Sequence, residues 1–206
     1  MASTSQVVPT FHGHISSTYD ALLVFEACLG GRLAPLPCRP SNLERAGLIR
    51  SGNVFVYEET SSGVKRWTDG VPWSPSRMLG NFLIYRELDA SFRPGAKRRA
   101  NKRSKSSGIS EHQPNESLYK SNPISQDVLR SLVGSLTTSY AFKVGGLVKK
   151  TISVTVGGLS HRLVSYYSIA DILDNKFTTP SKDPTFQHIT PRLDLAQHHF
   201  RWPLVE

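Results

Sequence analysis

Several features that mark particular classes of protein are scarce in this sequence. Only two of its 206 residues are cysteine, Cys28 and Cys38. They are too few for a disulfide framework and lack two further ligands for a zinc site, so we interpret both as buried thiols. No apolar run approaches the roughly 18 residues of a membrane-spanning helix. The first ten residues have neither the basic nor the apolar region of a secretion signal. We expect a soluble, intracellular protein with no membrane partner.

The usual signatures of catalysis and cofactor binding are also missing. The sequence contains no phosphate-binding glycine loop, nucleophile elbow or paired metal-ligand motif. His12 and His14 would share one face of a strand, and His198-His199 are adjacent, but neither pair has an identifiable third ligand. We therefore expect a protein that is not an enzyme, needs no cofactor and binds no metal.

Positive charge is abundant, and most of the excess lies in one segment. The 25 Lys and Arg residues exceed the 16 Asp and Glu residues, for a formal net charge of +9. Such a charge suits a polyanionic partner. Residues 11–89 hold eight basic and eight acidic side chains, whereas residues 90–127 hold eight basic and three acidic ones. The first half is therefore neutral, and the centre of the chain is strongly basic.

Residues 91–127 are predicted to form a flexible linker. They mix Ser, Asn, Gln, Pro and Gly with almost no alternating apolar pattern, so they cannot bury enough surface to offset the entropy of ordering. Residues 97–105 have six cations in nine positions, which suits phosphates or a nuclear import receptor. The alternative is a solvated basic loop. The residues expected to serve nuclear import are Lys97, Arg98, Arg99, Lys102 and Arg103.

Two helices are predicted near the amino terminus from their capping signals. Ser17 with Asp20, and Ser41 with Glu44, have the spacing of a capping box. The first precedes apolar residues at helical spacing, which predicts an amphipathic helix that ends at Gly30. The second predicts one short helical turn.

Strands are predicted next. Residues 53–58 are rich in β-branched and aromatic residues and predict a strand, and residues 64–67 are expected to return as its partner. Residues 76–79 follow Ser-Pro and are expected to begin a helix. Residues 82–88 fit either a helix or a strand.

In the second half, residues 147–156 and 159–167 flank Gly157-Gly158, which predicts a tight hairpin. Ser168 with Asp171 predicts a brief helix, and the tail from Thr179 is expected to be irregular and partly mobile.

A lone hairpin is marginal in water, so the two halves are expected to share one sheet. We predict a single α+β domain with an antiparallel β-sheet shared by two sequence blocks and few short helices. The blocks are residues 8–90 and 128–175, and residues 176–206 form an irregular tail.

Residues 63–86 combine basic and aromatic side chains in a way that suits nucleic-acid binding. Arginine can bond phosphates bidentately, pair with guanine or enter a narrow minor groove, and neighbouring tryptophans can preorder such an arm. The alternative is that the tryptophans belong to the core and the cations to a solvated face. The residues concerned are Lys65, Arg66, Trp67, Trp73, Arg77, Tyr85 and Arg86.

Three motifs follow one another in the first block: Lys65-Arg66-Trp67-Thr68-Asp69-Gly70, then Trp73-Ser74-Pro75-Ser76-Arg77, then residues 82–88. This series resembles the WOPR-box fungal transcriptional regulators. A second block, residues 142–151 through 161–167, is similar to the other conserved box of that family. Together the blocks cover most of residues 10–173.

The resemblance implies sequence-specific binding of double-stranded DNA in the nucleus. It implies that the shared sheet faces the major groove and that an arginine enters an A·T-rich minor groove. We assign that arginine to Arg66, because it lies beside Trp67, and Lys65 is the next candidate. Four further residues are expected to contact phosphates or a groove and to set the register: Arg50, Arg77, Lys149 and Lys150.

Three alternatives stay open at this point. Lys65-Arg66-Trp67-Thr68 fits the pattern of basophilic kinases, and a phosphate on Thr68 would weaken DNA binding by repulsion or by capturing Arg66. An unmodified turn threonine is the other interpretation of Thr68.

The whole protein could instead be a basic protein-interaction adaptor, or a single-strand or RNA-binding module that stacks bases on its aromatic residues.

Overall fold

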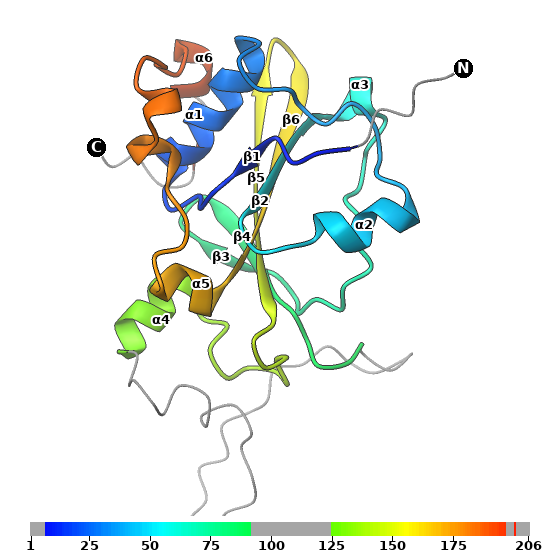
Figure 1. Ribbon diagram of the computed structural model, residues 1–206, viewed down its shortest axis with the longest axis vertical. Coiled ribbons are helices and arrows are strands. Elements are labelled where there is room, and N and C mark those ends of the chain that lie inside the picture. Colours follow the sequence, from blue (N-terminus) through cyan, green and yellow to red (C-terminus); the bar gives the residue numbers. More distant parts are fainter. Residues whose placement is uncertain (1–6, 92–124, 197–199, 201–206) are drawn as a thin grey trace, which may run out of the picture.

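Six antiparallel strands form one sheet in the computed structural model, which describes residues 7–91, 125–196 and 200. Their order is β1-β2-β6-β5-β4-β3, so the hairpin of the second block lies between β2 and β4 of the first (Figure 1). The prediction of an α+β fold with a sheet shared by both blocks is confirmed; most of the predicted linker lies outside the described residues. The strands are β1 (Phe11–His12), β2 (Asn53–Glu58), β3 (Arg77–Leu79), β4 (Phe82–Arg86), β5 (Leu147–Val156) and β6 (Leu159–Ser168).

The β5–β6 hairpin is the longest paired unit of the sheet, and its turn explains its register. Gly157 and Gly158 have φ angles of 56° and 79°. A side chain rarely tolerates this left-handed region, whereas glycine adopts it without penalty. Val156 therefore pairs with Leu159, and the ladder continues to Leu147 opposite Ser168. The predicted hairpin is confirmed.

Most helices are short, and three of them begin where the sequence predicts. Ser17 and Ser41 each form a reciprocal capping box, and the Ser168 hydroxyl accepts a hydrogen bond from the Asp171 backbone N–H. The helices are α1 (Thr18–Leu29), α2 (Asn42–Leu48), α3 (Glu59–Ser62), α4 (Gln126–Val133), α5 (Ile169–Leu173) and α6 (Leu193–Ala196), with 3-10 turns η2 (Pro180–Lys182) and η3 (Pro184–Phe186).

The main core lies between α1 and one face of the sheet, which we call the covered face. It contains Val56, Ile84, Val148 and Leu163 from four different strands. Helix α1 is buried over most of its middle, from Asp20 to Phe25. The buried surface of α1 is therefore wider than that of the amphipathic helix that the sequence predicts.

The carboxy-terminal segment covers the outer side of α1 (Figure 1). Phe186 and Leu195 are buried in the main core, and Arg192 forms two hydrogen bonds of 2.9 Å with the Glu26 carboxylate of α1. Instead of the irregular tail that was expected, residues 180–196 contain short helices that complete the core.

Two local predictions in the first half are wrong. Residues 64–67, expected to be a strand, form a loop after α3, and β6 occupies the place beside β2. Residues 77–79, expected to be helical, form β3 and pair with β4. In both cases a pairing partner decided by tertiary structure overrides the local signal.

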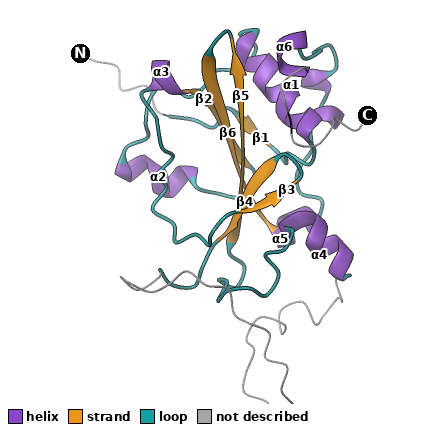
Figure 2. Cartoon of the chain, turned by 180° about the vertical axis from the view of Figure 1, so that it is seen from behind, coloured by secondary structure: helices purple, strands orange, loops and turns teal. Residues whose placement is uncertain are grey.

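The opposite face of the sheet is covered over only part of its width. A smaller cluster around Phe55, Val164 and Tyr166 also contains Leu48 of α2 and Val64 of the loop that follows α3. Figure 2 shows where α2 and this loop lie. Beyond this cover, side chains of β3, β4 and β5 face outward, and Met78 and Leu83 are exposed. We call this exposed part, formed by Met78, Leu83, Thr151 and Ser153, the open face.

The expectation that both cysteines are buried is wrong for Cys38, which is exposed, while Cys28 is partly buried. No helix within the described ranges is long and apolar enough to cross a membrane. Nor do the described residues contain a group of three or more His, Cys, Asp or Glu that could hold a metal ion.

Candidate nucleic-acid interface

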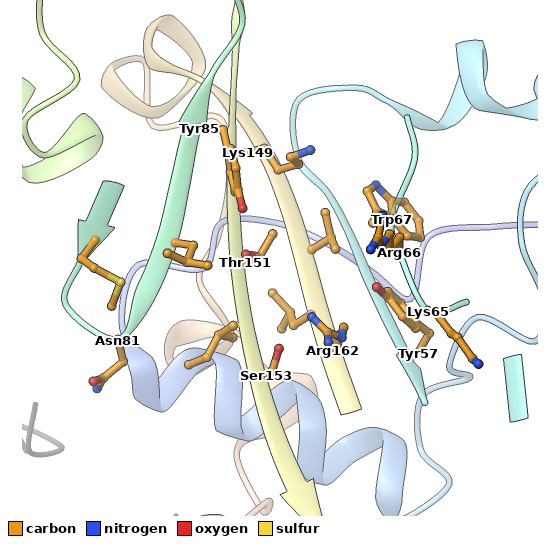
Figure 3. A pocket seen from close by; sticks show the side chains of 15 residues that line it. Tyr57, Lys65, Arg66, Trp67, Asn81, Tyr85, Lys149, Thr151, Ser153 and Arg162 are labelled. Atoms are coloured by element: carbon orange, nitrogen blue, oxygen red, sulfur yellow. The ribbon is translucent and has the colours of Figure 1, made fainter. Parts of the chain in front are cut away.

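A groove of about 450 Å³ lies on the open face (Figure 3). Its floor is made by side chains of β4, β5 and β6, and its rim by the loop after α3. The side chains that the following argument uses are Tyr57, Lys65, Arg66, Trp67, Ser153 and Arg162.

Lys65 and Arg66 lie at the rim, and both are exposed. Neither side chain forms an ion pair within the described part of the chain. They belong to a loop, not to the strand that the sequence analysis expected. The two cations next to the groove are therefore available to an anionic partner.

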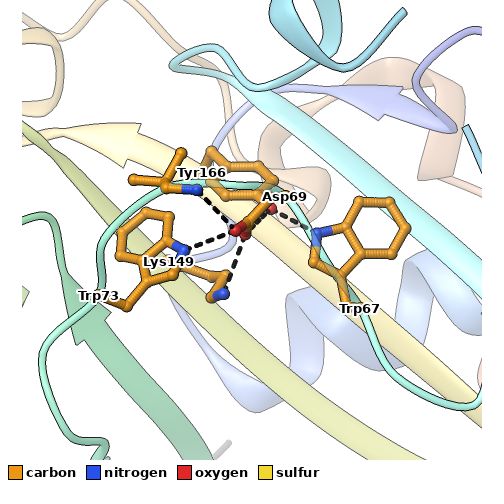
Figure 4. A network of polar contacts seen from close by, with 6 residues as sticks. Trp67, Asp69, Trp73, Lys149 and Tyr166 are labelled. Carbon is orange, nitrogen blue, oxygen red and sulfur yellow. Dashed lines mark hydrogen bonds and ion pairs between the residues drawn. The ribbon is translucent and has the colours of Figure 1, made fainter. Parts of the chain in front are cut away.

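The loop that carries Arg66 is attached to the sheet by a polar network around Asp69 (Figure 4). One carboxylate oxygen of Asp69 accepts a hydrogen bond from the Trp73 indole N–H at 2.8 Å. The other accepts from the Lys149 ammonium at 2.9 Å and from the Tyr166 hydroxyl at 2.7 Å. The Tyr166 oxygen in turn accepts from the Trp67 indole N–H at 2.5 Å.

Aromatic packing holds the same loop from a second direction. Trp67 stacks on Tyr57, with ring centroids 5.6 Å apart, and lies 5.3 Å from the ring of Phe55. Both partners belong to β2. The two interpretations of these tryptophans are thus compatible: Trp67 and Trp73 pack against the smaller cluster, while Arg66 stays exposed beside them.

The charges of the network follow from burial and proximity. Burial opposes ionisation of Asp69, but the Lys149 ammonium and hydrogen bonds from Trp73 and Tyr166 outweigh it and lower the pKa of Asp69. Burial lowers the pKa of Lys149, and Asp69 limits that fall. Burial, followed by the charge of Asp69, raises the pKa of the Tyr166 phenol. The network thus joins a buried Asp69–Lys149 ion pair to the Tyr166 hydroxyl.

The structure brings Lys149 to this site but not Lys150. The Lys149 side chain lines the groove and lies over the Trp73 ring, 4.5 Å from its centroid. The next residue, Lys150, points to the covered face, where its buried ammonium donates a hydrogen bond to the Ile15 carbonyl at 2.8 Å. An ammonium in that place faces the core and cannot reach a phosphate on the open face. The expectation that Lys150 contacts a phosphate is therefore corrected by the structure.

Arg77 and Arg50 also lie apart from the groove. Met78 lines the groove, so strand alternation turns its neighbour Arg77 away, and the Arg77 guanidinium donates to the Tyr140 hydroxyl at 3.3 Å. Arg50 is exposed in the turn before β2 and does not line the groove.

Thr68 is exposed, two residues after Arg66. This position is compatible with a modification site, and phosphorylation of Thr68 stays a prediction. The five residues expected to serve nuclear import lie outside the described residues.

Sequence reasoning missed one basic residue of the site, Arg162. Its guanidinium lines the groove and forms an ion pair with Glu59. A signal for it exists: the two-residue turn at Gly157-Gly158 pairs Ser153 with Arg162, which places both side chains on one face of the hairpin.

A family model described as the Gti1/Pac2 family matches residues 10–168. Among similar proteins, "Global transcription regulator sge1" of Fusarium oxysporum f. sp. lycopersici is 47% identical over 221 residues, which cover 100% of this chain and 67% of that protein. "Transcriptional regulator MIT1" of Saccharomyces cerevisiae is 38% identical, over 92% of this chain and 33% of that protein. The chain thus spans about two thirds of the length of the first of these relatives.

A solved structure with a similar fold is the complex of the WOPR domain of Wor1 in Candida albicans with a 13-bp double-stranded DNA. Its TM-score is 0.62 and its identity 33%, over 92% of this chain and 94% of that chain. The complex of the same domain with a 17-bp DNA has a TM-score of 0.61 at 32% identity.

Proposed function

Since this chain belongs to the Gti1/Pac2 family, we propose that it is a nuclear transcription regulator that binds double-stranded DNA through the groove and the Lys65-Arg66 loop. Membership of this family confirms the predicted WOPR-box resemblance. The family is one of transcription regulators, not of enzymes.

The observation that supports this proposal most directly is the way Arg66 is presented. It is exposed, it has no acidic partner among the described residues, and the adjacent Trp67 is held by stacking and by the Asp69 network. A preordered arginine loses less conformational entropy on binding than a free one. Narrow A·T minor grooves concentrate negative potential, which favours an inserted guanidinium. We assign minor-groove insertion to Arg66, with Lys65 as its neighbour on the phosphate backbone.

The open face gives the proposed interface its second part. Thr151 and Ser153 carry hydroxyls in consecutive outward positions of β5, and both line the groove. Hydroxyls donate and accept hydrogen bonds, so they suit phosphates and base edges in a major groove. Exposed Leu83 and Met78 beside them offer apolar contacts of the kind that thymine methyl groups take.

The single-strand or RNA-binding alternative is less well supported. It needs aromatic faces that are free to stack on bases. Trp67 is stacked on Tyr57, and the rings of Trp73 and Tyr85 lie beside the Lys149 ammonium, 4.5 and 4.9 Å from it. The protein-interaction adaptor remains a rival that experiment can separate.

Two further roles belong to this proposal. Nuclear import would use the basic residues 97–105 and an import receptor. A basophilic kinase would modify Thr68, and the added phosphate would repel DNA or capture Arg66. Thr68→Glu should then weaken DNA binding, and a variant that binds as tightly as the wild type would contradict the kinase role.

The deciding experiment is selection from a randomised duplex library, followed by binding curves at several salt concentrations. A regulator that reads duplex DNA should prefer one sequence over shuffled competitor by orders of magnitude. Its log affinity should fall linearly with log salt, with a slope that reports the number of phosphates contacted. An adaptor would show neither behaviour.

Two variants test the assignment of Arg66. Arg66→Ala should cost roughly 1–3 kcal/mol of binding free energy to the selected sequence and reduce the preference for it, whereas Lys65→Ala should weaken all sequences about equally. Arg32→Ala removes an exposed arginine just after α1, beside the covered face. It should change neither the binding free energy nor the preference for the selected sequence. Wild-type preference in Arg66→Ala would overturn the assignment.

A further inference from the structure

Arg162 and Glu59 form an ion pair inside the proposed DNA interface. Arg162 lies on β6, opposite Ser153 of β5 and Tyr57 of β2 (Figure 3). Its Nε atom donates to a carboxylate oxygen of Glu59. The pair faces solvent, because the two side chains are 42% and 25% exposed.

The neighbouring glutamate shows that Glu59 is not needed as a helix cap. Glu58 caps α3, with its carboxylate accepting from the backbone N–H groups of Thr60 at 2.5 Å and Ser61 at 2.7 Å. Among the described residues, the Glu59 carboxylate has Arg162 as its only hydrogen-bond and ion-pair partner. The role of this acid therefore depends on Arg162.

We infer that Arg162 is a further DNA contact and that Glu59 competes with DNA for it, so that a phosphate must displace the Glu59 carboxylate. The inference rests on the proposed function. A carboxylate and a phosphate make the same charge-assisted hydrogen bonds with a guanidinium, which makes the exchange chemically direct. An ion pair this exposed adds little to stability, so exchanging it does not endanger the fold.

Arg162 and Arg66 are held on the same frame. Tyr57 pairs with Arg162 across the β2–β6 ladder, and the same Tyr57 ring stacks on Trp67, the residue next to Arg66. Both guanidinium groups line one groove. DNA that takes Arg66 into a groove therefore brings its backbone close to the Arg162–Glu59 pair.

The consequence is that Glu59 lowers affinity without lowering sequence preference. A phosphate contact carries no direct sequence information, and each one adds about 0.9 to the slope of log affinity against log salt. Release of Arg162 in Glu59→Gln should therefore steepen the slope by about 0.9 and tighten binding to all duplexes roughly fivefold at 0.15 M salt.

The test is a double-mutant cycle read out as the salt slope of duplex binding. In the wild type the displaced Glu59 carboxylate takes up a cation for each one that the phosphate releases, so Arg162→Gln should weaken binding while its slope stays at the wild-type value. In that background Glu59→Gln should leave the slope unchanged, because no guanidinium remains to be released. Arg162→Lys keeps a point charge without the planar fork and should have an intermediate affinity. Thermal unfolding of each variant, expected to match the wild type, separates lost contacts from lost structure.

Asp174→Asn is the matched control. It removes one exposed carboxylate at the other end of β6 from Arg162, beyond α5, and should leave the slope and the affinity unchanged. An equal slope change from Glu59→Gln with and without Arg162, or an equal effect of Asp174→Asn, would overturn the inference, as would no effect of Glu59→Gln at all. Failure of the wild type to bind any duplex would overturn the proposed function instead.

Discussion

Lys149 and Lys150 are adjacent in the sequence and occupy opposite faces of the sheet. Lys149 faces the groove and pairs with Asp69, whereas Lys150 enters the core and bonds the Ile15 carbonyl. Successive side chains of a strand point to opposite faces, so a pair of lysines on β5 cannot form one basic patch. A basic dipeptide in a strand thus supplies one side chain to each face, and only one of them can serve a ligand.

The two faces differ in what their polar groups do. On the covered face, burial lowers the pKa of Lys150 to about 8, and burial followed by the charge of Lys150 lowers the pKa of His14 to about 4. On the other face, the buried polar groups are paired with one another around Asp69. Lys150 and His14 on the covered face are therefore ionisable at a cost in stability, whereas the network around Asp69 on the other face holds a loop in place.

The largest expected change in the free energy of unfolding comes from replacing Lys149 and Lys150 one at a time. Lys149→Met leaves Asp69 as an uncompensated buried charge, which should lower the free energy of unfolding by about 3–5 kcal/mol. Lys150→Met leaves only the Ile15 carbonyl without its donor, and the loss should be at most about 3 kcal/mol. Urea unfolding at pH 7 measures both. A larger loss at Lys150 than at Lys149 would contradict the comparison.

Acid should expose the cost of His14. The pKa of His14 is 6.5 in the unfolded chain and about 4 in the folded protein. The charge of Asp20 raises the pKa in the folded protein, but by less than burial and Lys150 lower it. Stability from this group is therefore complete above pH 6.5 and falls by about 3 kcal/mol as the pH drops to 4. His14→Gln should lose less stability than the wild type over this range in urea unfolding. Parallel curves would show that His14 is not the group responsible.

Raising the pH should show how much stability the burial of Lys150 costs. Its pKa is about 8 in the folded protein against an ordinary value of 10.5. At pH 8 the unfolded chain holds the proton more tightly, so the free energy of unfolding should rise by about 2 kcal/mol from pH 8 to pH 10. The rise should be smaller by about that amount in Lys150→Met, in which Lys149 keeps its own lowered pKa. Persistence of the full rise there would assign the effect to another group.

The smallest effect should follow a change of one hydrogen bond on the groove side. Trp67→Phe keeps a ring against Tyr57 and removes the N–H that bonds the Tyr166 hydroxyl. It should cost about 1 kcal/mol of stability. The Arg66 loop should also become less ordered, and duplex affinity should fall modestly. A variant with normal stability and normal affinity would show that stacking alone positions the loop.

Much of the fold could be predicted from local signals. The capping boxes at Ser17 and Ser41 and the turn at Gly157-Gly158 are short-range chemistry, and the structure confirms all three. Residues 64–67 and 77–79 could not be assigned in the same way. Strand pairing is a contact between distant segments, and β6, about a hundred residues later, takes the place beside β2.

The site was predictable in part, for the same reason. Arg66 was expected on a strand but lies in an exposed loop beside Trp67, and its contact with DNA stays a prediction. The expected phosphate contact of Lys150 does not fit the structure, because the expectation ignored which face of a strand the side chain takes. Arg77 also points away from the groove, and its contact with DNA stays a prediction. Arg162 became visible only when the hairpin register was combined with the knowledge of which face is open.

The cap and turn positions, the hairpin register and the family can all be read from residue types at short and fixed spacings. Which face of the sheet is buried cannot, since that depends on where α1, the carboxy-terminal segment and the loop after α3 pack. Their packing puts Lys150 in the core, Lys149 beside Asp69, and Arg162 in the groove. Alternation along a strand separates the two faces equally, and contacts with distant segments determine which of the faces water can reach.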